Sequence, residues 1–101
     1  MGGVPLTQTT VADDLTIRVL LDDGRMLLVL AGELDTFGAA QLAPWLSGAV
    51  VIDMAAVTFI DSRGLRVLGR ALRAGAHIVI RDPSTVVRRA LDVAHLNELL
   101  E

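Results

Sequence analysis

The spacing of hydrophobic and polar residues along the chain predicts strands that alternate with helices. Residues 15–20 alternate between apolar and polar side chains, which is typical of a half-buried edge strand. Residues 26–31 are continuously apolar, as expected for a strand that is covered on both faces. Because the turn residues 22–25 separate these two segments, we expect them to form a hairpin. Residues 49–54 and 76–80 have the apolar, partly β-branched composition of two further buried strands.

Three helices are predicted between and after these strands. Asp35 or Thr36 is a suitable N-cap for the first helix, which Pro44 should shorten or kink. The second helix is predicted to begin near Ser62, because leucines recur at helical spacing after it. Cap candidates at residues 82–84 precede the third helix.

The resulting order β-β-α-β-α-β-α predicts an α/β fold with a mixed, mostly parallel four-stranded sheet packed with helices. Residues 96–100 would add a short last helix. Residues 1–13 are rich in Gly, Thr and Pro and lack periodicity. We therefore expect a flexible N-terminal leader over residues 1–13, followed by one domain over residues 14–101.

The composition supports a folded domain and excludes several kinds of site. Of the 101 residues, 52% are hydrophobic and only 3% are aromatic, which predicts an aliphatic core. The absence of cysteine excludes disulfides and thiolate metal sites, and the absence of lysine excludes a phosphate-binding loop that ends in Gly-Lys. No apolar stretch reaches the roughly 20 residues that span a bilayer, and the amino terminus lacks the features of a secretory signal. We therefore expect a cytoplasmic protein with no membrane partner.

Charge is distributed unevenly along the chain. The net charge is −6 over residues 1–62 and +3 over residues 63–101, within a total of −3. Arginines recur at three- and four-residue steps on the second predicted helix, opposite its leucines, at positions 63, 66, 70 and 73. This stripe is either a solvated helix face or a docking face for an acidic partner. Direct nucleic-acid binding is less favoured, because the domain is acidic overall and no aromatic residues accompany the arginines.

Candidate chemistry lies in the loops that follow the predicted parallel strands, where α/β sheets usually carry function. Ser62 is the strongest candidate, at a predicted helix start and close to several carboxylates. Its hydroxyl is either an N-cap or an exposed phosphorylation site, and the two roles are compatible. A phosphoryl group there would add about −1.5 to −2 charges to the surface. The loops concerned hold Glu33 and Asp35, then Asp53 with residues 61–64, and finally Arg81 with Asp82.

Enzymatic and metal-binding alternatives have weaker support in the sequence. A serine hydrolase would need a Gly-x-Ser-x-Gly turn, but only Gly64 matches this pattern around Ser62. A triad would also need a nearby histidine, whereas His77 is predicted at the opposite end of the sheet and His95 lies near the carboxyl terminus. The aspartates have no third metal ligand at convincing spacing. We therefore expect no catalytic residue, no metal and no cofactor.

Residues 50–65, which read Val-Val-Ile-Asp-Met-Ala-Ala-Val-Thr-Phe-Ile-Asp-Ser-Arg-Gly-Leu, resemble the signature of STAS domains, specifically of bacterial anti-sigma factor antagonists. Residues 32–35 are similar to that family's second motif, and residues 82–91 resemble its third helix. The resemblance covers about residues 15–101 and implies the STAS fold. The Asp-Ser-x-Gly-Leu segment is the most specific part of the match.

The resemblance implies a regulatory mechanism for Ser62. In such proteins the matching serine is phosphorylated by an anti-sigma factor that is itself a serine kinase. The unphosphorylated antagonist binds this kinase and frees the sigma factor, so that it regulates transcription, for example in a stress response. Phosphorylation releases the antagonist, and a PP2C-type phosphatase restores it.

The resemblance also implies which residues surround the phosphorylation site. Asp35 is expected beside Ser62, where it would contribute to phosphorylation or to partner contact. Arg63 stands where a small hydroxyl residue is common, and therefore changes the charge that a kinase would meet. The expected partner-binding residues are Glu33, Asp35, Asp61, Arg63, Gly64, Leu65 and Arg66. The alternative is a ligand-sensing or scaffolding STAS module, either nucleotide-binding or transporter-regulatory, without control of a sigma factor.

Overall fold

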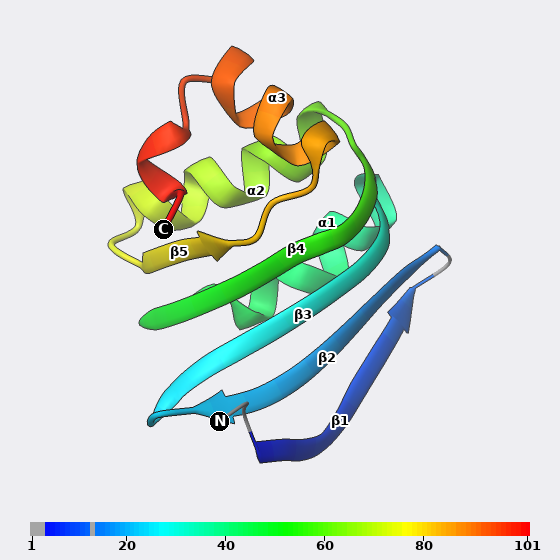
Figure 1. Ribbon diagram of the computed structural model, residues 1–101, viewed down its shortest axis with the longest axis vertical. Helices are drawn as coiled ribbons and strands as arrows, with labels where there is room; N and C mark the ends of the chain where they lie inside the picture. Colours follow the sequence, from blue (N-terminus) through cyan, green and yellow to red (C-terminus); the bar gives the residue numbers. More distant parts are fainter. Residues whose placement is uncertain (1–3, 13) are drawn as a thin grey trace.

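In the described part of the chain, five strands form one mixed sheet in the order β1-β2-β3-β4-β5 (Figure 1). The computed structural model describes residues 4–12 and 14–101. The antiparallel part consists of β1 (Val4–Ala12), β2 (Leu15–Asp22) and β3 (Arg25–Leu34). On the other side of β3, β4 (Ala49–Ile60) and β5 (His77–Arg81) run parallel to it.

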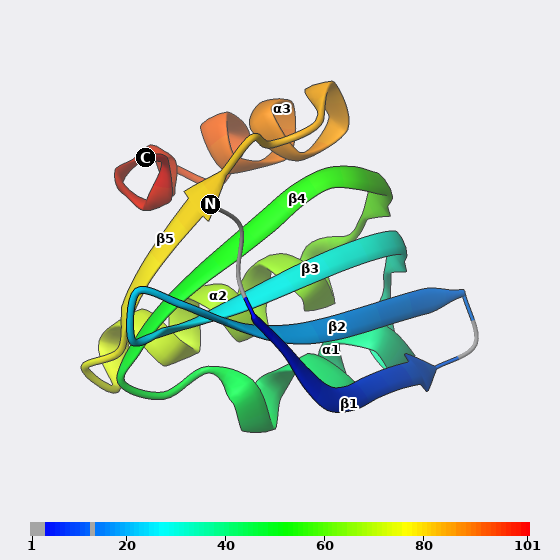
Figure 2. The same ribbon diagram turned by 60° about the horizontal axis from the view of Figure 1, so that its bottom comes forward.

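Two helices connect the parallel strands, and a third follows the last strand. The first, α1 (Thr36–Leu42), continues into a 3-10 turn, η1 (Ala43–Trp45), which contains Pro44 at its start. It is followed by α2 (Ser62–Arg73), α3 (Thr85–Val93) and a second 3-10 turn, η2 (Asn97–Leu99). The helices α1 and α2 lie together on one face of the sheet, and α3 lies beyond β4, far from β1 (Figure 2). In the part of the chain that the structure describes, no helix is both long enough and apolar enough to cross a bilayer.

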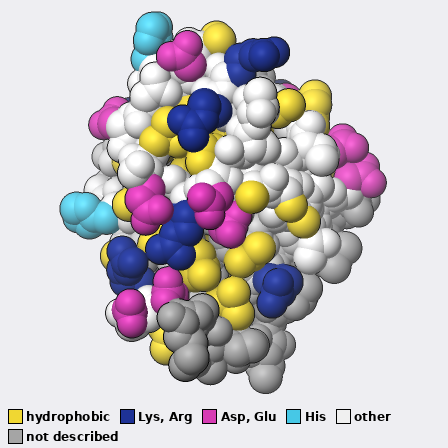
Figure 3. All heavy atoms as spheres, viewed as in Figure 1, with side chains coloured by type: hydrophobic (Ala, Val, Ile, Leu, Met, Phe, Trp, Pro, Cys, Tyr) yellow, Lys and Arg dark blue, Asp and Glu magenta, His cyan; other side chains and the backbone are white. Residues whose placement is uncertain are grey.

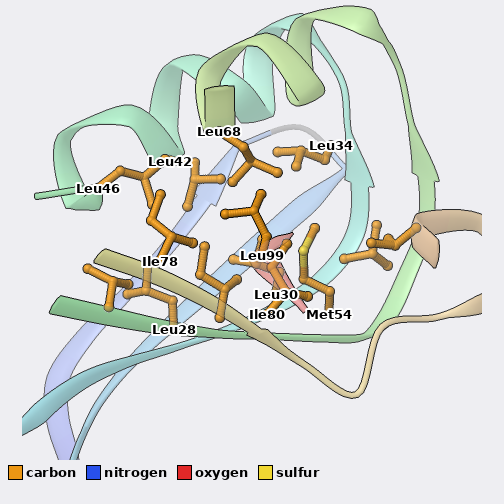
Figure 4. Close-up of a cluster of buried hydrophobic side chains, with 14 of the residues drawn as sticks. Leu28, Leu30, Leu34, Leu42, Leu46, Met54, Leu68, Ile78, Ile80 and Leu99 are labelled. Atoms are coloured by element: carbon orange, nitrogen blue, oxygen red, sulfur yellow. The ribbon is translucent and has the colours of Figure 1, made fainter. Parts of the chain in front are cut away.

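The core between the sheet and the helices is aliphatic, as the composition predicts (Figure 4). No aromatic side chain is among the buried hydrophobic residues of the described part. Strand residues meet leucines of the helices in this cluster, which includes Leu28, Leu30, Ile52, Met54 and Ile80 from the sheet with Leu42, Leu68, Leu91 and Leu99 from the helices. The helices are therefore held by burial of their apolar faces.

The other face of the sheet carries a smaller apolar cluster with an ion-pair network near it. Side chains that are adjacent along a strand point to opposite faces of the sheet. Those on this face include Leu20, Leu27 and Val51, which are buried. The Arg81 guanidinium lies 3.5 Å from carboxylate oxygens of both Asp22 and Glu101. Burial lowers the pKa of Arg81, but attraction to Glu101 and Asp22 outweighs it, so this pKa is raised above its usual value. On this face, acidic and basic side chains are in contact beside hydrophobic ones (Figure 3).

The α/β class and the order of elements from residue 15 onward are confirmed, but the predicted leader is partly wrong. The segment Val4–Ala12 is strand β1, which pairs with β2, so β2 is an inner strand and the sheet has a fifth member. The register of β1 shifts between Pro5 and Thr9, which breaks the alternation by which a strand is recognised in sequence. Proline is tolerated because β1 lies at the edge of the sheet. Residues 1–3 and 13 of the predicted leader lie outside the described residues.

Strands β3 and β4 both extend beyond their predicted ends, at residues 31 and 54. Register shifts after Val29 and after Gly32 interrupt the hydrophobic pattern there, although pairing resumes. Gly32 has φ +108°, and a Cβ at this position would collide with the backbone oxygen of Asp14. The next residue, Glu33, donates its N–H to the same oxygen at 2.9 Å. These irregularities carry the parallel pairing on to Leu34 and Ile60.

Two neighbouring valines of α3 test how much this core stabilises the fold. Val87 is fully buried, whereas Val86 is 43% exposed. Val87→Ala should lower the free energy of unfolding by about 1–3 kcal/mol, because it removes buried methyl groups and leaves a cavity. Val86→Ala should change it by less than about 0.5 kcal/mol. Urea denaturation of both variants measures the difference, and equal losses would contradict this placement of α3.

Candidate functional site

The carboxyl ends of β3 and β4 bring two distant loops together. Leu34 and Ile60 are the last paired residues of these strands, and Asp35 and Asp61 directly follow them. The Asp61 N–H donates to the carbonyl oxygen of Leu34 at 3.3 Å. The expected neighbourhood of Asp35 and Ser62 is therefore present in the structure.

Close packing at Gly64 holds these two loops in place. A Cβ on Gly64 would lie 2.6 Å from the Leu34 carbonyl oxygen and 3.0 Å from the Ile60 side chain, both closer than normal contact. The first turn of α2 therefore rests directly on the end of β3 because residue 64 has no side chain. Gly64 is itself buried, so it affects the site by fixing the position of α2.

Asp61, rather than Ser62, is the N-cap of α2. Its carboxylate accepts the N–H groups of Arg63 at 2.9 Å and Gly64 at 3.0 Å. A carboxylate suits this position, because it satisfies free amides and its charge is favourable beside the positive end of the helix dipole. Of the two roles that the sequence leaves open for the Ser62 hydroxyl, the N-cap role is therefore wrong.

Ser62 is the first residue of α2, and its side chain is exposed. Among the described residues, none forms a hydrogen bond with its hydroxyl. Because Asp61 takes the capping role, the Ser62 hydroxyl is not needed for the helix cap. The positive end of the helix dipole also favours negative charge at this first turn.

Asp35 has the equivalent role in the neighbouring helix. Its carboxylate accepts the Gly38 N–H at 3.0 Å and caps α1, so that Thr36, the other candidate, is not the cap. Asp35 is half-buried, which leaves part of the carboxylate open to a partner. Glu33 is also half-buried beside this loop and pairs with Phe59 of β4.

Both phenylalanines of the chain are exposed at this end of the sheet. Phe37 lies two residues after Asp35 and is 63% exposed, and Phe59 lies two residues before Asp61 and is 44% exposed. Aromatic side chains are enriched in protein interfaces, so both are candidates for partner contact. They do not stand out in the sequence, because an aromatic residue in an apolar pattern is ordinarily expected in the core. Their spacing from the two aspartates was the only available signal.

Two other residues that the sequence offered as candidates, Asp53 and Asp82, lie away from Ser62. Asp53 is inside β4, level with Val29 and Arg81, and its carboxylate accepts the Ala55 N–H at 3.0 Å. Because β5 pairs with β4 only as far as Asp53, the loop that contains Asp82 leaves the sheet well before β4 reaches Ser62. The extension of β4 to Ile60 therefore separates Asp53 and Asp82 from the loop that contains Ser62.

The remaining predicted residues are on the surface of α2. Arg63 and Arg66 are exposed, and Leu65 is half-buried. Leu65 lines an apolar groove of about 340 Å³ between α2 and α3, together with Val86, Ala90 and Val93 among others. The two histidines are on other elements, since His77 begins β5 at its amino end and His95 follows α3.

Comparison with known proteins finds a family model and solved structures that resemble this chain. A family model described as "Mlab, STAS domain" matches residues 17–101. Among solved structures, an anti-sigma factor antagonist from Mycobacterium paratuberculosis is 24% identical with a TM-score of 0.74, and the match covers 90% of this chain and 86% of that one. No curated protein matches the chain in sequence.

Two further structures are of SpoIIAA. The anti-sigma factor antagonist SpoIIAA in its unphosphorylated form is 21% identical with a TM-score of 0.69, over 84% of this chain and 85% of that one. The Bacillus cell fate determinant SpoIIAA in the phosphorylated form is 15% identical with a TM-score of 0.66, over 84% and 88% of the two chains. These likenesses confirm the fold that the sequence predicts.

Substitutions at the start of α2 test the division of roles between Asp61 and Ser62. Asp61→Ala should lower the free energy of unfolding by about 0.5–2 kcal/mol, because two helix amides lose their acceptor. Asp61→Asn should retain most of this stability, since asparagine is an equally good N-cap. Ser62→Ala should change it by less than about 0.5 kcal/mol. Chemical denaturation measures all three, and a loss in Ser62→Ala equal to that in Asp61→Ala would show that the serine caps the helix.

Two glycines of α2 test the contact with β3. Gly64→Ala should lower the free energy of unfolding by about 1–3 kcal/mol, because the added methyl group collides with the Leu34 backbone. Gly69→Ala is the matched control, since its added Cβ would meet only the Arg73 side chain, at 3.6 Å. This control should gain about 0.5–1 kcal/mol from the better helix propensity of alanine. A gain in both variants, read from thermal unfolding, would rule out the close contact.

Proposed function

Since the chain belongs to the STAS domain family, we propose that it is a cytoplasmic anti-sigma factor antagonist that binds an anti-sigma factor kinase through the surface around Ser62. In this proposal, the unphosphorylated chain occupies the kinase and so frees a sigma factor for transcription. The kinase phosphorylates Ser62 and the complex dissociates. A PP2C-type phosphatase then restores the binding form. The chain is a ligand and a substrate in this cycle and performs no catalysis of its own.

The observation that carries the proposal is the Ser62 hydroxyl, which is exposed and forms no hydrogen bond within the described residues. It is not needed as a helix cap, because Asp61 has that role. A phosphoryl group on this oxygen would project from the first turn of α2. The helix dipole favours negative charge there, and the cap does not use the Ser62 hydroxyl, so the modification would leave the domain folded. Its charge would instead change the contact with a partner, as a switch requires. The likeness to SpoIIAA, whose structure is known in unphosphorylated and phosphorylated forms, supports the same conclusion.

The surrounding residues would divide into those that position Ser62 and those that touch the partner. Asp61 and Gly64 hold the first turn of α2 through the cap and through the contact with Leu34. The exposed or half-buried side chains around them would form the contact surface, which consists of Glu33, Asp35, Arg63, Leu65 and Arg66 with Phe37 and Phe59. Exposed aromatic rings beside charged groups give such a surface both contact area and orientation.

Phosphorylation and binding can be tested with the purified chain and the kinase-type anti-sigma factors of its source bacterium. With ATP, one of them should place one phosphate per chain on Ser62, as located by mass spectrometry. Ser62→Ala should abolish this reaction, and Ser84→Ala should not, because Ser84 caps α3 through its bond to the Val87 N–H. Phosphate on Ser84 or Thr85 in the wild-type chain would contradict the proposal.

Binding of the same anti-sigma factor should depend on charge at residue 62. Ser62→Asp should weaken the complex about tenfold or more, because a carboxylate is introduced into the contact. Asparagine has nearly the same shape as aspartate but no charge, so Ser62→Asn should bind much more tightly than Ser62→Asp. Surface plasmon resonance measures both. If no anti-sigma factor binds but ATP or GTP binds in calorimetry, the chain is instead a ligand-sensing module.

A further inference from the structure

A second groove lies on the other side of Ser62, between α1 and α2. Its volume is about 360 Å³, and its small residues include Ala39, Ala40 and Ala43 of α1 and η1. Three arginines of α2 line it as well, at positions 63, 66 and 70, and Thr36 and Val67 complete the lining. The α1 segment Thr36–Leu42 contains no charged residue, so the groove holds three positive charges and no negative one.

These arginines have no counter-charge within the described part of the chain. The ion pairs found there join Arg81 to Asp22 and to Glu101, on the other face of the sheet. Arg63, Arg66 and Arg70 are all exposed, and all project from a protein whose net charge is −3. A local positive groove on an acidic protein attracts an acidic ligand while the protein as a whole repels polyanions.

We infer that the α1–α2 groove binds an acidic segment of a partner protein, through carboxylates that pair with Arg66 and Arg70. Guanidinium groups form bidentate pairs with carboxylates, which gives such a contact both strength and orientation. The small alanines allow the backbone of the bound segment to approach closely. A protein is favoured over a nucleic acid, because no aromatic side chain lines the groove on which a base could stack. The inference rests on the proposed function for the identity of the partner.

The same arginines connect the groove to the phosphorylation site. Arg63 is adjacent to Ser62, and Arg66 follows it by four residues, so that Ser62 and Arg66 are neighbours on the surface of α2. A phosphoryl group on Ser62 would pair with these guanidinium groups. It would then compete with the acidic segment for the same partners. Phosphorylation would release the partner partly because the phosphoryl group, an anion of the chain itself, would pair with the arginines that the acidic segment uses.

The groove can be tested without knowledge of the partner. The probe is a synthetic helical peptide with glutamate at every fourth position in an alanine-rich sequence, titrated into the isotope-labelled full chain and followed by backbone amide shifts. Shifts should map to α1 and the first half of α2. The double variant Arg66→Gln/Arg70→Gln should bind the peptide about five- to tenfold more weakly. Arg73→Gln is the matched control on the same helix, because Arg73 is exposed but lines a different groove with Leu96 and Glu98.

Phosphoserine incorporated at residue 62 during synthesis tests the competition. The phosphorylated chain should bind the peptide at least about fivefold more weakly than the unphosphorylated chain. Equal binding by the wild-type chain and the double variant, or shifts outside the groove, would overturn the inference. Single-stranded DNA or phosphatidylglycerol vesicles that bind the groove more tightly than the peptide would also overturn it.

The two proposals fail in distinguishable ways. If the peptide binds the groove but no anti-sigma factor binds the chain, the acidic-segment site stands and the proposed function falls. If an anti-sigma factor binds Arg66→Gln/Arg70→Gln as tightly as it binds the wild-type chain, the site is overturned and the proposed function stands.

Discussion

The parallel pairing of β3 with β4, carried as far as Leu34 and Ile60, is the constraint on which the site depends. Each strand is followed at once by an aspartate that caps the next helix. Because the strands end side by side, the two helix starts do so as well. Gly64 completes the arrangement by allowing α2 to rest on the Leu34 backbone. Positions separated by about a quarter of the chain thus become one surface through backbone geometry.

At the start of α2, two neighbouring side chains have different roles. Asp61 satisfies two amides of α2, which leaves the adjacent hydroxyl unbonded and exposed. A serine that capped its own helix would give up a stabilising bond whenever it was modified. Here the helix cap and the exposed hydroxyl belong to different residues. The arrangement is consistent with a residue that changes its charge repeatedly in a domain that stays folded.

The sequence predicted the parts of the fold that have strong periodicity and failed where backbone irregularity hides it. The leucines of α2 and the apolar runs of the central strands identified their elements, because burial on one face or on both leaves a regular pattern. Strand β1 and the ends of β3 and β4 were missed, since register shifts interrupt that pattern. Ser62 was singled out by its position at a predicted helix start and by the resemblance that residues 50–65 carry. Its relation to the cap, and the exposure of Phe37 and Phe59, depend on packing that local sequence does not specify.

The placement of Ser62 on an exposed first helical turn has a consequence for how long a phosphate would persist. A phosphoryl group enclosed in a cavity would be held by many contacts and shielded from a second enzyme. At the exposed Ser62 it would keep one side open to solvent even while it pairs with Arg63 and Arg66. A second enzyme would therefore reach it without a movement of the domain, so that how long the phosphate persists would depend on that enzyme.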